Sequence, residues 1–220
     1  MAPKILTSLQ QDFIALFAKN RYFKDYFYLT GGTALAAYYL HHRYSEDLDF
    51  FSLKEVGLLE VDAFLQEVKT PLKIVKTDFQ QTFNRNIFFL HTKKEILKVE
   101  FTYFPFEQLE KPERKDGILI DNIVDIAVNK TFTIFQNPRA RDFIDLYLIL
   151  KERKELFLSK LVKMARSKFD SQIDPIQLGA QLLKSKDIQD LPRMIKKINH
   201  QQWRVFFTNQ AKSLSDQIFK

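Results

Sequence analysis

The spacing of apolar residues predicts that the chain opens with a helix and then alternates short strands with helices. Across residues 4–19 the apolar side chains recur at helical intervals on one face. Short apolar runs at 26–30 and 47–51 predict strands, and residues 33–41 between them resume a helical pattern. The opening helix is therefore followed by a strand, a helix and a second strand.

The middle of the chain is rich in predicted strands, whereas the remainder is helical. The polar segment 92–95 is typical of a hairpin turn. We expect strands over 72–79, 83–91, 96–103 and 117–120, and helices over 54–69, 121–135, 139–151, 155–168, 175–186 and 201–217. This order predicts an α+β fold: a mixed β-sheet core flanked by helices in residues 1–152, then a helical C-terminal part in residues 153–220.

A glycine pair, Gly31-Gly32, lies between the first predicted strand and the helix expected to begin near Thr33. Glycine lets a phosphate approach the backbone closely, and a helix start offers unpaired N–H groups with a partial positive charge. Together these features suit the phosphates of a nucleotide. A Gly-Gly pair by itself is more often a tight turn, so its meaning depends on the residues after it in the chain.

Two carboxylates, Asp47 and Asp49, come later on the next predicted strand. Residues i and i+2 of a strand point to the same side, roughly 6–7 Å apart along the chain. Carboxylates so placed repel each other unless a cation lies beside them, and hard oxygen ligands suit Mg²⁺ or Mn²⁺. Such ions can activate an attacking hydroxyl and stabilise a leaving pyrophosphate. Two solvated aspartates on an edge strand are the alternative, but the nearby glycine turn favours a metal site.

A third carboxylate, Glu100, is expected on a neighbouring strand. Residues 97–103 alternate in character, so that Leu97, Val99, Phe101 and Tyr103 share one face and Lys98, Glu100 and Thr102 share the other. An ordinary exposed glutamate would give the same pattern. Glu100 is therefore a candidate third metal ligand or general base.

The spacing of these residues resembles the signature of the AbiEii/AbiGii nucleotidyltransferases, within the polymerase-beta-like superfamily. The resemblance rests on Gly31, Gly32, Thr33, Ala34 and Leu35, followed by Arg43, Ser45, Asp47, Asp49 and Phe50. Many superfamily members have Gly-Ser where this chain has Gly-Gly-Thr, so Thr33 would supply the hydroxyl one position later. Glu100 falls where the superfamily places a third acidic residue, often an aspartate that is one methylene shorter.

A second stretch of the resemblance covers residues 125–147, and the whole resemblance covers roughly 26–150. It implies that Lys130 contacts the triphosphate, and that Arg141, Asp142 and Asp145 shape the nucleotide pocket together with Arg43 and Ser45. From the residues alone, Asp142 and Asp145 share a helix face, and a surface ion-pair helix remains an alternative for Arg141. Lys130 lies on a mostly apolar helix, where a lysine snorkels or reaches an anion.

The composition of the chain indicates its cellular compartment and the charge of its partner. Cysteine is absent, which excludes disulfides and thiolate metal sites and fits the reducing cytoplasm. No signal peptide and no membrane-spanning run is recognisable. Lys and Arg number 34 against 27 acidic residues, and this net charge of +7 fits an anionic partner such as RNA as well as it fits simple solubility. The basic residues of the C-terminal helices, from Lys160 to Lys197, fit an RNA-facing surface as well as they fit solvated helix faces.

The sequence thus predicts a cytoplasmic, Mg²⁺- or Mn²⁺-dependent nucleotidyltransferase that transfers a nucleotide from an NTP to an acceptor, with tRNA or another RNA favoured. The resemblance implies the toxin of a toxin–antitoxin or phage-defence system, with an antitoxin as partner. Two alternatives stay open: nucleotidylation of a protein, such as the antitoxin, and a catalytically silent module that binds a nucleotide or a partner.

Overall fold

The computed structural model describes residues 5–55 and 57–218, which form two compact units. The first unit is Met1–Asn122 and the second is Ile123–Lys220. Helix α5 (Ile123–Gln136) groups with the second unit because it packs on α6 (Ala140–Glu152), α7 (Leu158–Phe169) and α8 (Pro175–Leu183). The sequence predicts a domain boundary near residue 152, at the end of α6, between a core and a helical C-terminal part. That division remains a prediction.

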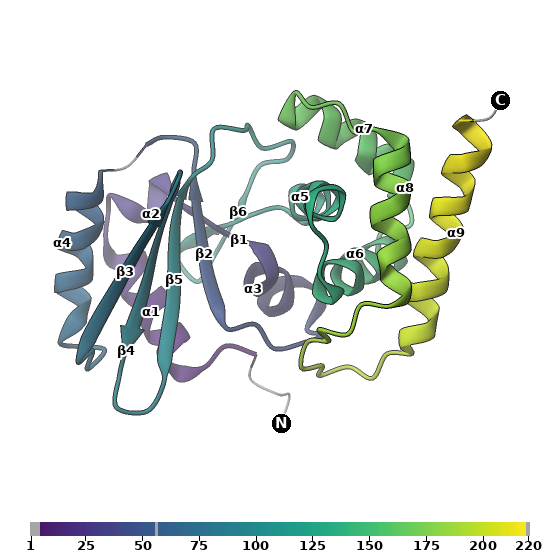
Figure 1. Cartoon of the computed structure of the whole chain (residues 1–220). Helices are drawn as coiled ribbons and strands as arrows, with labels where there is room; N and C mark the ends of the chain where they lie inside the picture. The colour runs from purple at the N-terminus through teal and green to yellow at the C-terminus, as the bar shows by residue number, and fades with distance from the viewer. Residues whose placement is uncertain (1–4, 56, 219–220) are drawn as a thin grey trace. The chain divides into compact units, whose positions relative to one another are not determined.

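Seven strands within the described residues form one mixed sheet in the first unit (Figure 1). Their order is β3 (Lys76–Thr82), β4 (Arg85–His91), β5 (Ile96–Tyr103), β2 (Asp47–Ser52), β1 (Tyr28–Thr30), β7 (Ile118–Ile120) and β6 (Glu113–Lys115). The pairs β2–β5 and β1–β7 are parallel, and the other neighbours are antiparallel. The expected α+β fold with a mixed sheet is confirmed, and β2 lies in its interior between β5 and β1.

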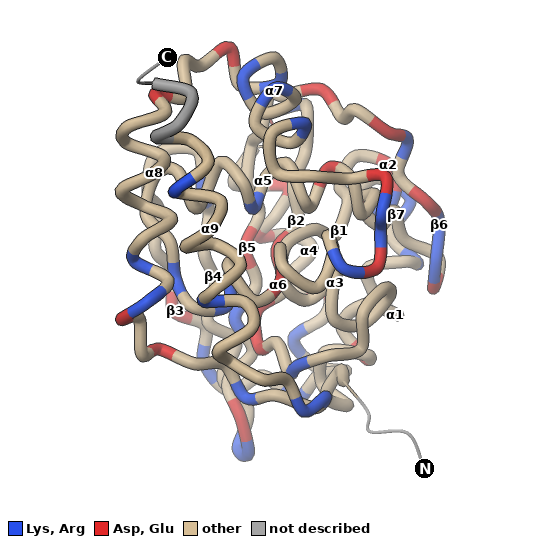
Figure 2. The backbone as a smooth tube through the Cα atoms, turned by 90° about the vertical axis from the view of Figure 1, so that its right-hand side faces the viewer, with Lys and Arg blue, Asp and Glu red and all other residues tan. Residues whose placement is uncertain are grey.

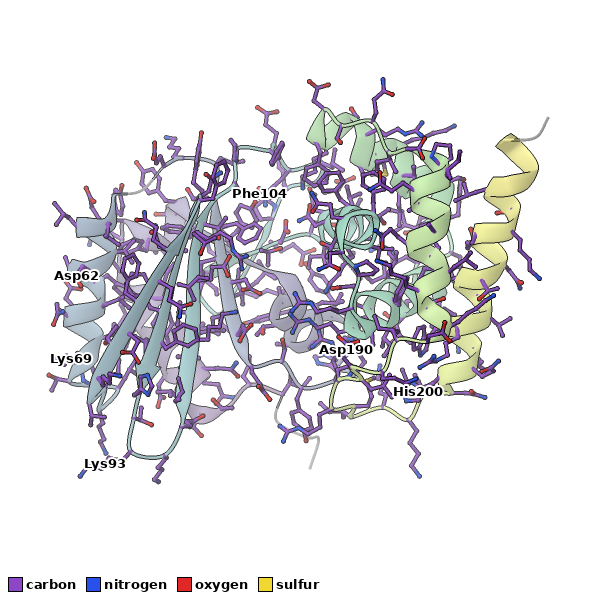
Figure 3. All side chains as sticks on the ribbon, viewed as in Figure 1. Asp62, Lys69, Lys93, Phe104, Asp190 and His200 are labelled. Carbon is purple, nitrogen blue, oxygen red and sulfur yellow. The ribbon has the colours of Figure 1, made fainter. Side chains whose placement is uncertain are left out.

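Phenylalanine rings fill the space between one face of this sheet and two helices, α1 (Ser8–Lys19) and α4 (Leu58–Lys69). The ring of Phe17 on α1 stacks on Phe50 of β2 with centroids 4.2 Å apart, and Phe50 in turn lies 5.7 Å from Phe101 of β5. Phe64 of α4 meets the Phe17 ring edge-on at 5.7 Å. Polar side chains of α4, such as Asp62 and Lys69, project away from the sheet (Figure 3). These rings form a phenylalanine-rich core on one face of the sheet.

Several shorter elements of the first unit were placed differently by the sequence, or missed. The helix expected from Thr33 begins at Gly31 as α3 (Gly31–Leu35) and continues as a π-helix, Ala36–Leu40. The chain leaves this π-helix through His41, whose backbone is left-handed with φ 50°. The sequence did not predict α2 (Phe23–Tyr26) or β6, which are only four and three residues long.

The second unit is helical, as expected for the C-terminal part. Its α9 (His200–Ile218) contributes Trp203, which is fully buried and lies 6.0 Å from the ring of Phe143 on α6. A short 3₁₀ turn, Lys184–Lys186, follows α8. Lys and Arg positions recur along α7 (Figure 2). The side chain of one of these, Lys168, is 1% exposed and is ion-paired to Asp125 rather than solvated.

No helix in the described part of the chain is both long and apolar enough to cross a membrane.

Candidate functional site

The alternation of β2 separates its carboxylates from its apolar residues. Leu48 and Phe50 are fully buried on the face that holds the phenylalanine core, whereas Asp47 and Asp49 lie on the opposite face and are partly exposed. Because successive strand residues point to opposite faces, burial of Leu48 and Phe50 fixes the direction of both aspartates. The structure therefore brings Asp47 and Asp49 to one side of the sheet.

The glycine turn lies directly against Asp49. Thr30, the last residue of β1, pairs with Asp49 in the sheet, and the next residue, Gly31, has a φ of +70°. A Cβ atom added to Gly31 would lie 2.7 Å from Asp49 Oδ2, closer than real Cβ contacts allow. Only glycine satisfies both the left-handed backbone and the close approach of the carboxylate. The two halves of the sequence motif thus meet in space.

Three further motif residues converge on the same turn. A Cβ on Gly32 would overlap Arg43 Nη2 and would lie 3.2 Å from Ser45 Oγ. Arg43 is itself buried, and its Nη1 donates to the carbonyl oxygen of Tyr44 at 2.9 Å. Thr33 is fully buried, and its hydroxyl donates to the carbonyl oxygen of Asp47. This hydrogen bond links α3 to β2. The sequence predicts instead that the Thr33 hydroxyl contacts the phosphates.

Glu100 lies beside Asp49 but faces an arginine. The two residues are partners in the parallel β2–β5 register, so their side chains share a face. Arg85 of β4 donates to both carboxylate oxygens of Glu100, from Nε at 2.6 Å and from Nη2 at 2.5 Å. The Thr102 hydroxyl donates to Oε1 at 2.7 Å, and Glu100 is only 2% exposed. The hydrogen bonds to Glu100 raise the pKa of Arg85, and the charges of Asp49 and Asp47 add to this effect.

A lysine completes the charge pattern on this face. Lys98, two residues before Glu100, donates from Nζ to Asp47 Oδ2 at 2.7 Å. The carboxylates of Asp47, Asp49 and Glu100 are thus accompanied by two cations, Lys98 and Arg85. Among the described residues, no group of three or more His, Cys, Asp or Glu side chains is arranged to hold a metal ion. The three-carboxylate metal cluster therefore stays a prediction.

The second unit gathers the other motif residues around Lys130 of α5. Its Nζ lies 2.7 Å from Asp142 Oδ1 and 2.9 Å from Asp145 Oδ2, both on α6 and both buried. This confirms that Asp142 and Asp145 share a helix face. Asp142 also accepts from the backbone N–H of Arg139 at 3.1 Å, which caps the first turn of α6. Arg141, which directly precedes Asp142, is half-buried.

The comparisons with known proteins decide the family. A family model described as nucleotidyl transferase AbiEii toxin, Type IV TA system, matches residues 14–219. The chain belongs to the AbiEii nucleotidyl transferase family. An uncharacterized protein of Aquifex aeolicus, aq_aa25, is 34% identical over 154 residues, which are 67% of this chain and 69% of that protein.

Two crystal structures from Helicobacter pylori share the fold of this AbiEii-family chain. A candidate nucleotidyltransferase superposes with a TM-score of 0.62 at 22% identity, covering 95% of this chain and 92% of the other. The protein JHP933 superposes with a TM-score of 0.60 at 23% identity, covering 95% and 90%. The family model identifies this chain as a nucleotidyltransferase, and these structures show that its fold is shared along almost its full length.

Two charged neighbours of the AbiEii motif, Arg85 and Lys98, are not predicted as site residues by the sequence. The sequence predicts Arg85 only as part of a strand and Lys98 only as part of the polar face of the next strand. The predicted hairpin turn at 92–95 is enough to place Arg85. Pairing residues outward from this turn sets Arg85 opposite Thr102, two residues from Glu100. The parallel pairing of Asp47 with Lys98 left no such local signal, because β2 and β5 are far apart in the chain.

Proposed function

We propose that this AbiEii-family protein transfers a nucleotide from an NTP to an acceptor, with tRNA or another RNA as the favoured acceptor. The observation that carries the proposal is the packing of Asp49 Oδ2 against the Gly31 backbone, with Asp47 on the same face of the strand. This geometry puts two carboxylates beside a turn that a phosphate can approach closely. We propose a cytoplasmic location for this reaction, because NTPs and RNA are both present there.

The side chains of Asp47 and Asp49 fit a divalent cation. They share a face of β2, they are partly exposed, and their hard carboxylate oxygens suit Mg²⁺ or Mn²⁺. When bound, such a cation would polarise phosphate oxygens and stabilise the leaving pyrophosphate. Glu100, the register partner of Asp49, is the proposed third carboxylate, and Arg85 and Thr102 fix its orientation.

The protein's own groups would position the reacting atoms. In the proposed reaction an acceptor hydroxyl oxygen bonds to the α-phosphorus of the NTP, the bond to the pyrophosphate oxygen breaks, and the hydroxyl proton leaves to a base, for which Glu100 is the candidate. Gly31 and Gly32 would admit the phosphates, and Thr33, Arg43 and Ser45 would shape that turn. Pre-organised positive groups stabilise the charge that develops on phosphate oxygens.

We also propose that the second unit contributes nucleotide contacts through Lys130, with Arg141, Asp142 and Asp145 around it. The family match, which covers α5 and α6, supports this role. The ion pairs of Lys130 to Asp142 and Asp145 hold its ammonium group in a fixed position and offset its charge. Membership of a family described as Type IV toxins supports a role as the toxin of a toxin–antitoxin or phage-defence system with an antitoxin partner.

Labelled nucleotides test the proposal directly. The protein is incubated with each α-labelled NTP, Mg²⁺ or Mn²⁺, total cellular RNA and cellular protein, and the label is then located. We expect label in RNA, loss of the signal with EDTA, and at least about a hundredfold loss in Asp47→Asn and Asp49→Asn, since both remove a proposed metal ligand. Asp62→Asn, at an exposed position of α4, is the matched control and should retain activity.

The outcomes separate the three functions. Label that enters only protein would replace the RNA acceptor with a protein acceptor such as the antitoxin. Equal activity, or equal toxicity on expression, of wild type and Asp47→Asn would contradict the proposed chemistry and favour a silent binding module.

A further inference from the structure

Strand β3 (Lys76–Thr82) is a long, exposed edge of the sheet in the first unit. It stands at the end of the strand order, and within the described residues its ladder partner is β4 alone. Six of its seven residues are exposed, whereas β6, at the opposite edge, is only three residues long. Edge strands carry a row of N–H and C=O groups that can pair with another strand, and proteins usually keep such edges short, charged or covered. A seven-residue exposed edge therefore indicates a pairing surface.

The two charged residues of β3 leave this edge without net charge. Lys76 Nζ lies 2.8 Å from Asp78 Oδ1, and His91 of β4 also contacts Asp78. A lysine on an edge strand discourages pairing with a further strand, but the charge of Lys76 is balanced within β3 itself. Two such edges can therefore approach each other without net repulsion.

The register of β3 and β4 shows which backbone groups of the edge face outward. The N–H of Tyr103, next to β5, donates to the carbonyl oxygen of Asn84 at 3.0 Å, so Asn84 directs its backbone groups toward β5. Successive residues of an antiparallel strand direct these groups to opposite sides, so Arg85 directs its own toward its partner Thr82 on β3. The same alternation along β3 turns the groups of every second residue away from β4. The outward residues of β3 are Thr77, Phe79 and Gln81.

These outward residues are arranged symmetrically about Phe79, the middle residue of β3. Thr77 lies two residues before Phe79, and Gln81 lies two residues after it. An identical strand that approaches in the antiparallel direction can therefore set Phe79 opposite Phe79 of the second copy, and Thr77 opposite Gln81 of the second copy. Each opposed pair would exchange two N–H···O=C bonds, because these residues all direct their backbone groups outward. The edge is thus complementary to itself.

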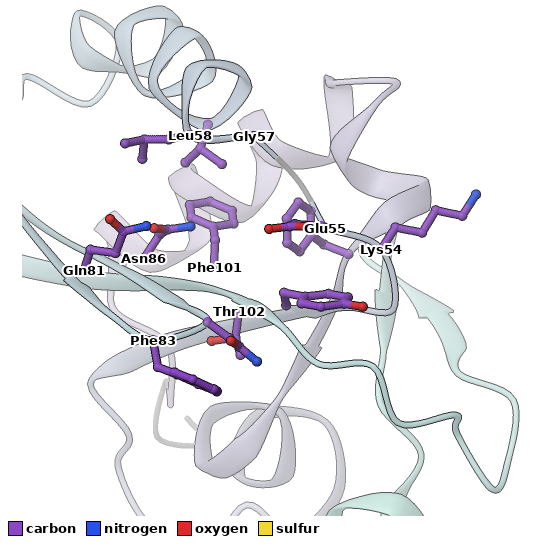
Figure 4. A pocket seen from close by; sticks show the side chains of 13 residues that line it. Lys54, Glu55, Gly57, Leu58, Gln81, Phe83, Asn86, Phe101 and Thr102 are labelled. Carbon is purple, nitrogen blue, oxygen red and sulfur yellow. The ribbon is translucent and has the colours of Figure 1, made fainter.

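Exposed apolar side chains follow the same symmetry. Val75 and Phe83 flank β3, each four residues from Phe79, and the exposed fractions are 58% for Val75, 41% for Phe79 and 93% for Phe83. The Phe83 ring, in the turn between β3 and β4, projects from the strands on the side opposite Leu58 (Figure 4). In the antiparallel pairing, Val75 of one copy comes level with Phe83 of the other. Apolar residues at both ends of the edge would therefore gain a neighbour, as cross-strand pairs do within a sheet.

We propose that β3 pairs with β3 of a second copy of this chain, antiparallel and about a two-fold axis at Phe79, so that two sheets join into one. A two-fold interface uses the same patch on both copies, and strand addition at a sheet edge supplies main-chain hydrogen bonds. A second copy is favoured over an unrelated peptide because the outward backbone groups and the exposed apolar residues share one centre of symmetry. The pairing sets Lys76 opposite Thr82 of the second copy. Asp78 falls opposite Gln80, so no like charges oppose each other.

The interface formed by β3 is separate from the proposed catalytic face. β4 and β5 lie between β3 and β2, the strand that carries Asp47 and Asp49. This inference therefore goes beyond the proposed nucleotidyl transfer and does not rest on it.

Single cysteines test the register, since the chain has no cysteine of its own. Opposed residues of an antiparallel pair have Cα atoms roughly 4.5–5.5 Å apart, within reach of a disulfide. Under mild oxidation we expect Phe79→Cys to form a covalent dimer, which a non-reducing gel detects. Thr77→Cys and Gln81→Cys should link to each other when mixed but not to themselves, because identical positions two residues from the axis lie roughly 14 Å apart. Leu59→Cys, at an 84% exposed position of α4, is the control for random collision.

Molar mass in solution tests the backbone pairing. Size exclusion with light scattering should give wild type twice the mass of one chain. Thr77→Pro removes an outward N–H from each copy, so we expect it to weaken association at least about tenfold while the ladder to β4 persists. Thr77→Val keeps that N–H and is the matched control, which should remain dimeric. Thermal melting of each variant verifies that it is folded.

Several results would overturn the proposal. They are a wild-type mass of one chain up to the highest soluble concentration, linking of Phe79→Cys no faster than that of Leu59→Cys, and a dimer that folded Thr77→Pro leaves unchanged. Self-linking of Thr77→Cys without the mixed product with Gln81→Cys would place the axis elsewhere and overturn the proposal as well.

Discussion

Arg85 and Glu100 form a two-pronged ion pair between neighbouring strands, with Nη2 and Oε2 2.5 Å apart and Nε and Oε1 2.6 Å apart. The Glu100 carboxylate is buried, whereas half of the Arg85 side chain is exposed. A buried carboxylate is costly without a partner, so the arginine allows a third acidic side chain to lie beside Asp49. The acidic face of the sheet therefore depends on a basic residue outside the family motif.

Replacing Arg85 should destabilise the first unit. We expect Arg85→Met to lower the free energy of unfolding by about 1–3 kcal/mol, because it leaves the buried Glu100 carboxylate without its ion pair. The stability of Arg85→Lys should lie between those of Arg85→Met and wild type, because lysine keeps the positive charge but cannot donate two parallel hydrogen bonds to the carboxylate. Urea denaturation measures the change. Lys76→Met is the control, because its ion pair with Asp78 is exposed to solvent and should contribute little to stability. Equal stability of Arg85→Met and wild type would refute the dependence.

The two glycines Gly31 and Gly179 should respond oppositely to alanine. At Gly31 an added Cβ meets Asp49 Oδ2 at 2.7 Å on a left-handed backbone, so Gly31→Ala should cost more than about 1 kcal/mol and reduce nucleotidyl transfer at least about tenfold. Gly179 lies inside α8 with nothing within 4 Å of its Cβ position, so Gly179→Ala should stabilise by about 0.5–1 kcal/mol. Melting curves and transfer assays on both variants test this, and a neutral Gly31→Ala would contradict the close approach of Asp49.

The ion pair of Lys168 with Asp125 should be the most sensitive charge pair of the second unit. The two side chains are 1% and 0% exposed, with Nζ and Oδ1 2.6 Å apart. Lys168→Met alone should destabilise by about 3–5 kcal/mol because it leaves a buried carboxylate. Adding Asp125→Leu should recover a large part of that loss, since an apolar pair can replace a buried ion pair. A double-mutant cycle by urea denaturation measures the coupling, and additive costs would contradict it.

Acid titration should show a lowered pKa at Asp78. The hydrogen bond from Lys76 is the main cause, and His91 adds to it at 2.8 Å from Asp78 Oδ2. Because the folded pKa lies below the unfolded one, this pair stabilises the fold above the unfolded pKa of about 3.9, and the contribution disappears as the pH falls through the folded pKa. NMR titration of the Asp78 carboxyl measures the shift. Lys76→Met should move the pKa upward, and an unchanged value would refute the assigned cause.

The elements that local pattern controls were predictable from the sequence. The alternation in β5 and the polar turn 92–95 placed β4 and β5 close to their observed bounds. For β3 the expected range 72–79 began too early, because Leu72 and Ile74 are buried although they precede the strand. The strand itself, Lys76–Thr82, is largely exposed and polar, so apolar periodicity could not mark its end.

The site was predictable only where it depends on strand alternation and spacing. Asp47 and Asp49 share a face because Leu48 and Phe50 are buried, and this requires no knowledge of the sheet order. The contact of Lys98 with Asp47 depends on β2 and β5 becoming neighbours, which the sequence does not state, whereas the predicted hairpin turn at 92–95 is enough to place Arg85 near Glu100. The start of α3 at Gly31 and the close approach of Asp49 to this turn are likewise properties of the folded chain.

The strict alternation of β2 also limits how this gene can change. Because side-chain direction reverses at every residue, inserting or deleting one residue within Asp47–Ser52 would turn the carboxylates into the phenylalanine core and the rings toward the substrate. A substitution at one position of this strand leaves the direction of its other side chains unchanged, whereas a change in the length of the strand reverses them. Across homologous genes, alignment gaps should therefore fall in the flanking loops and spare these six codons.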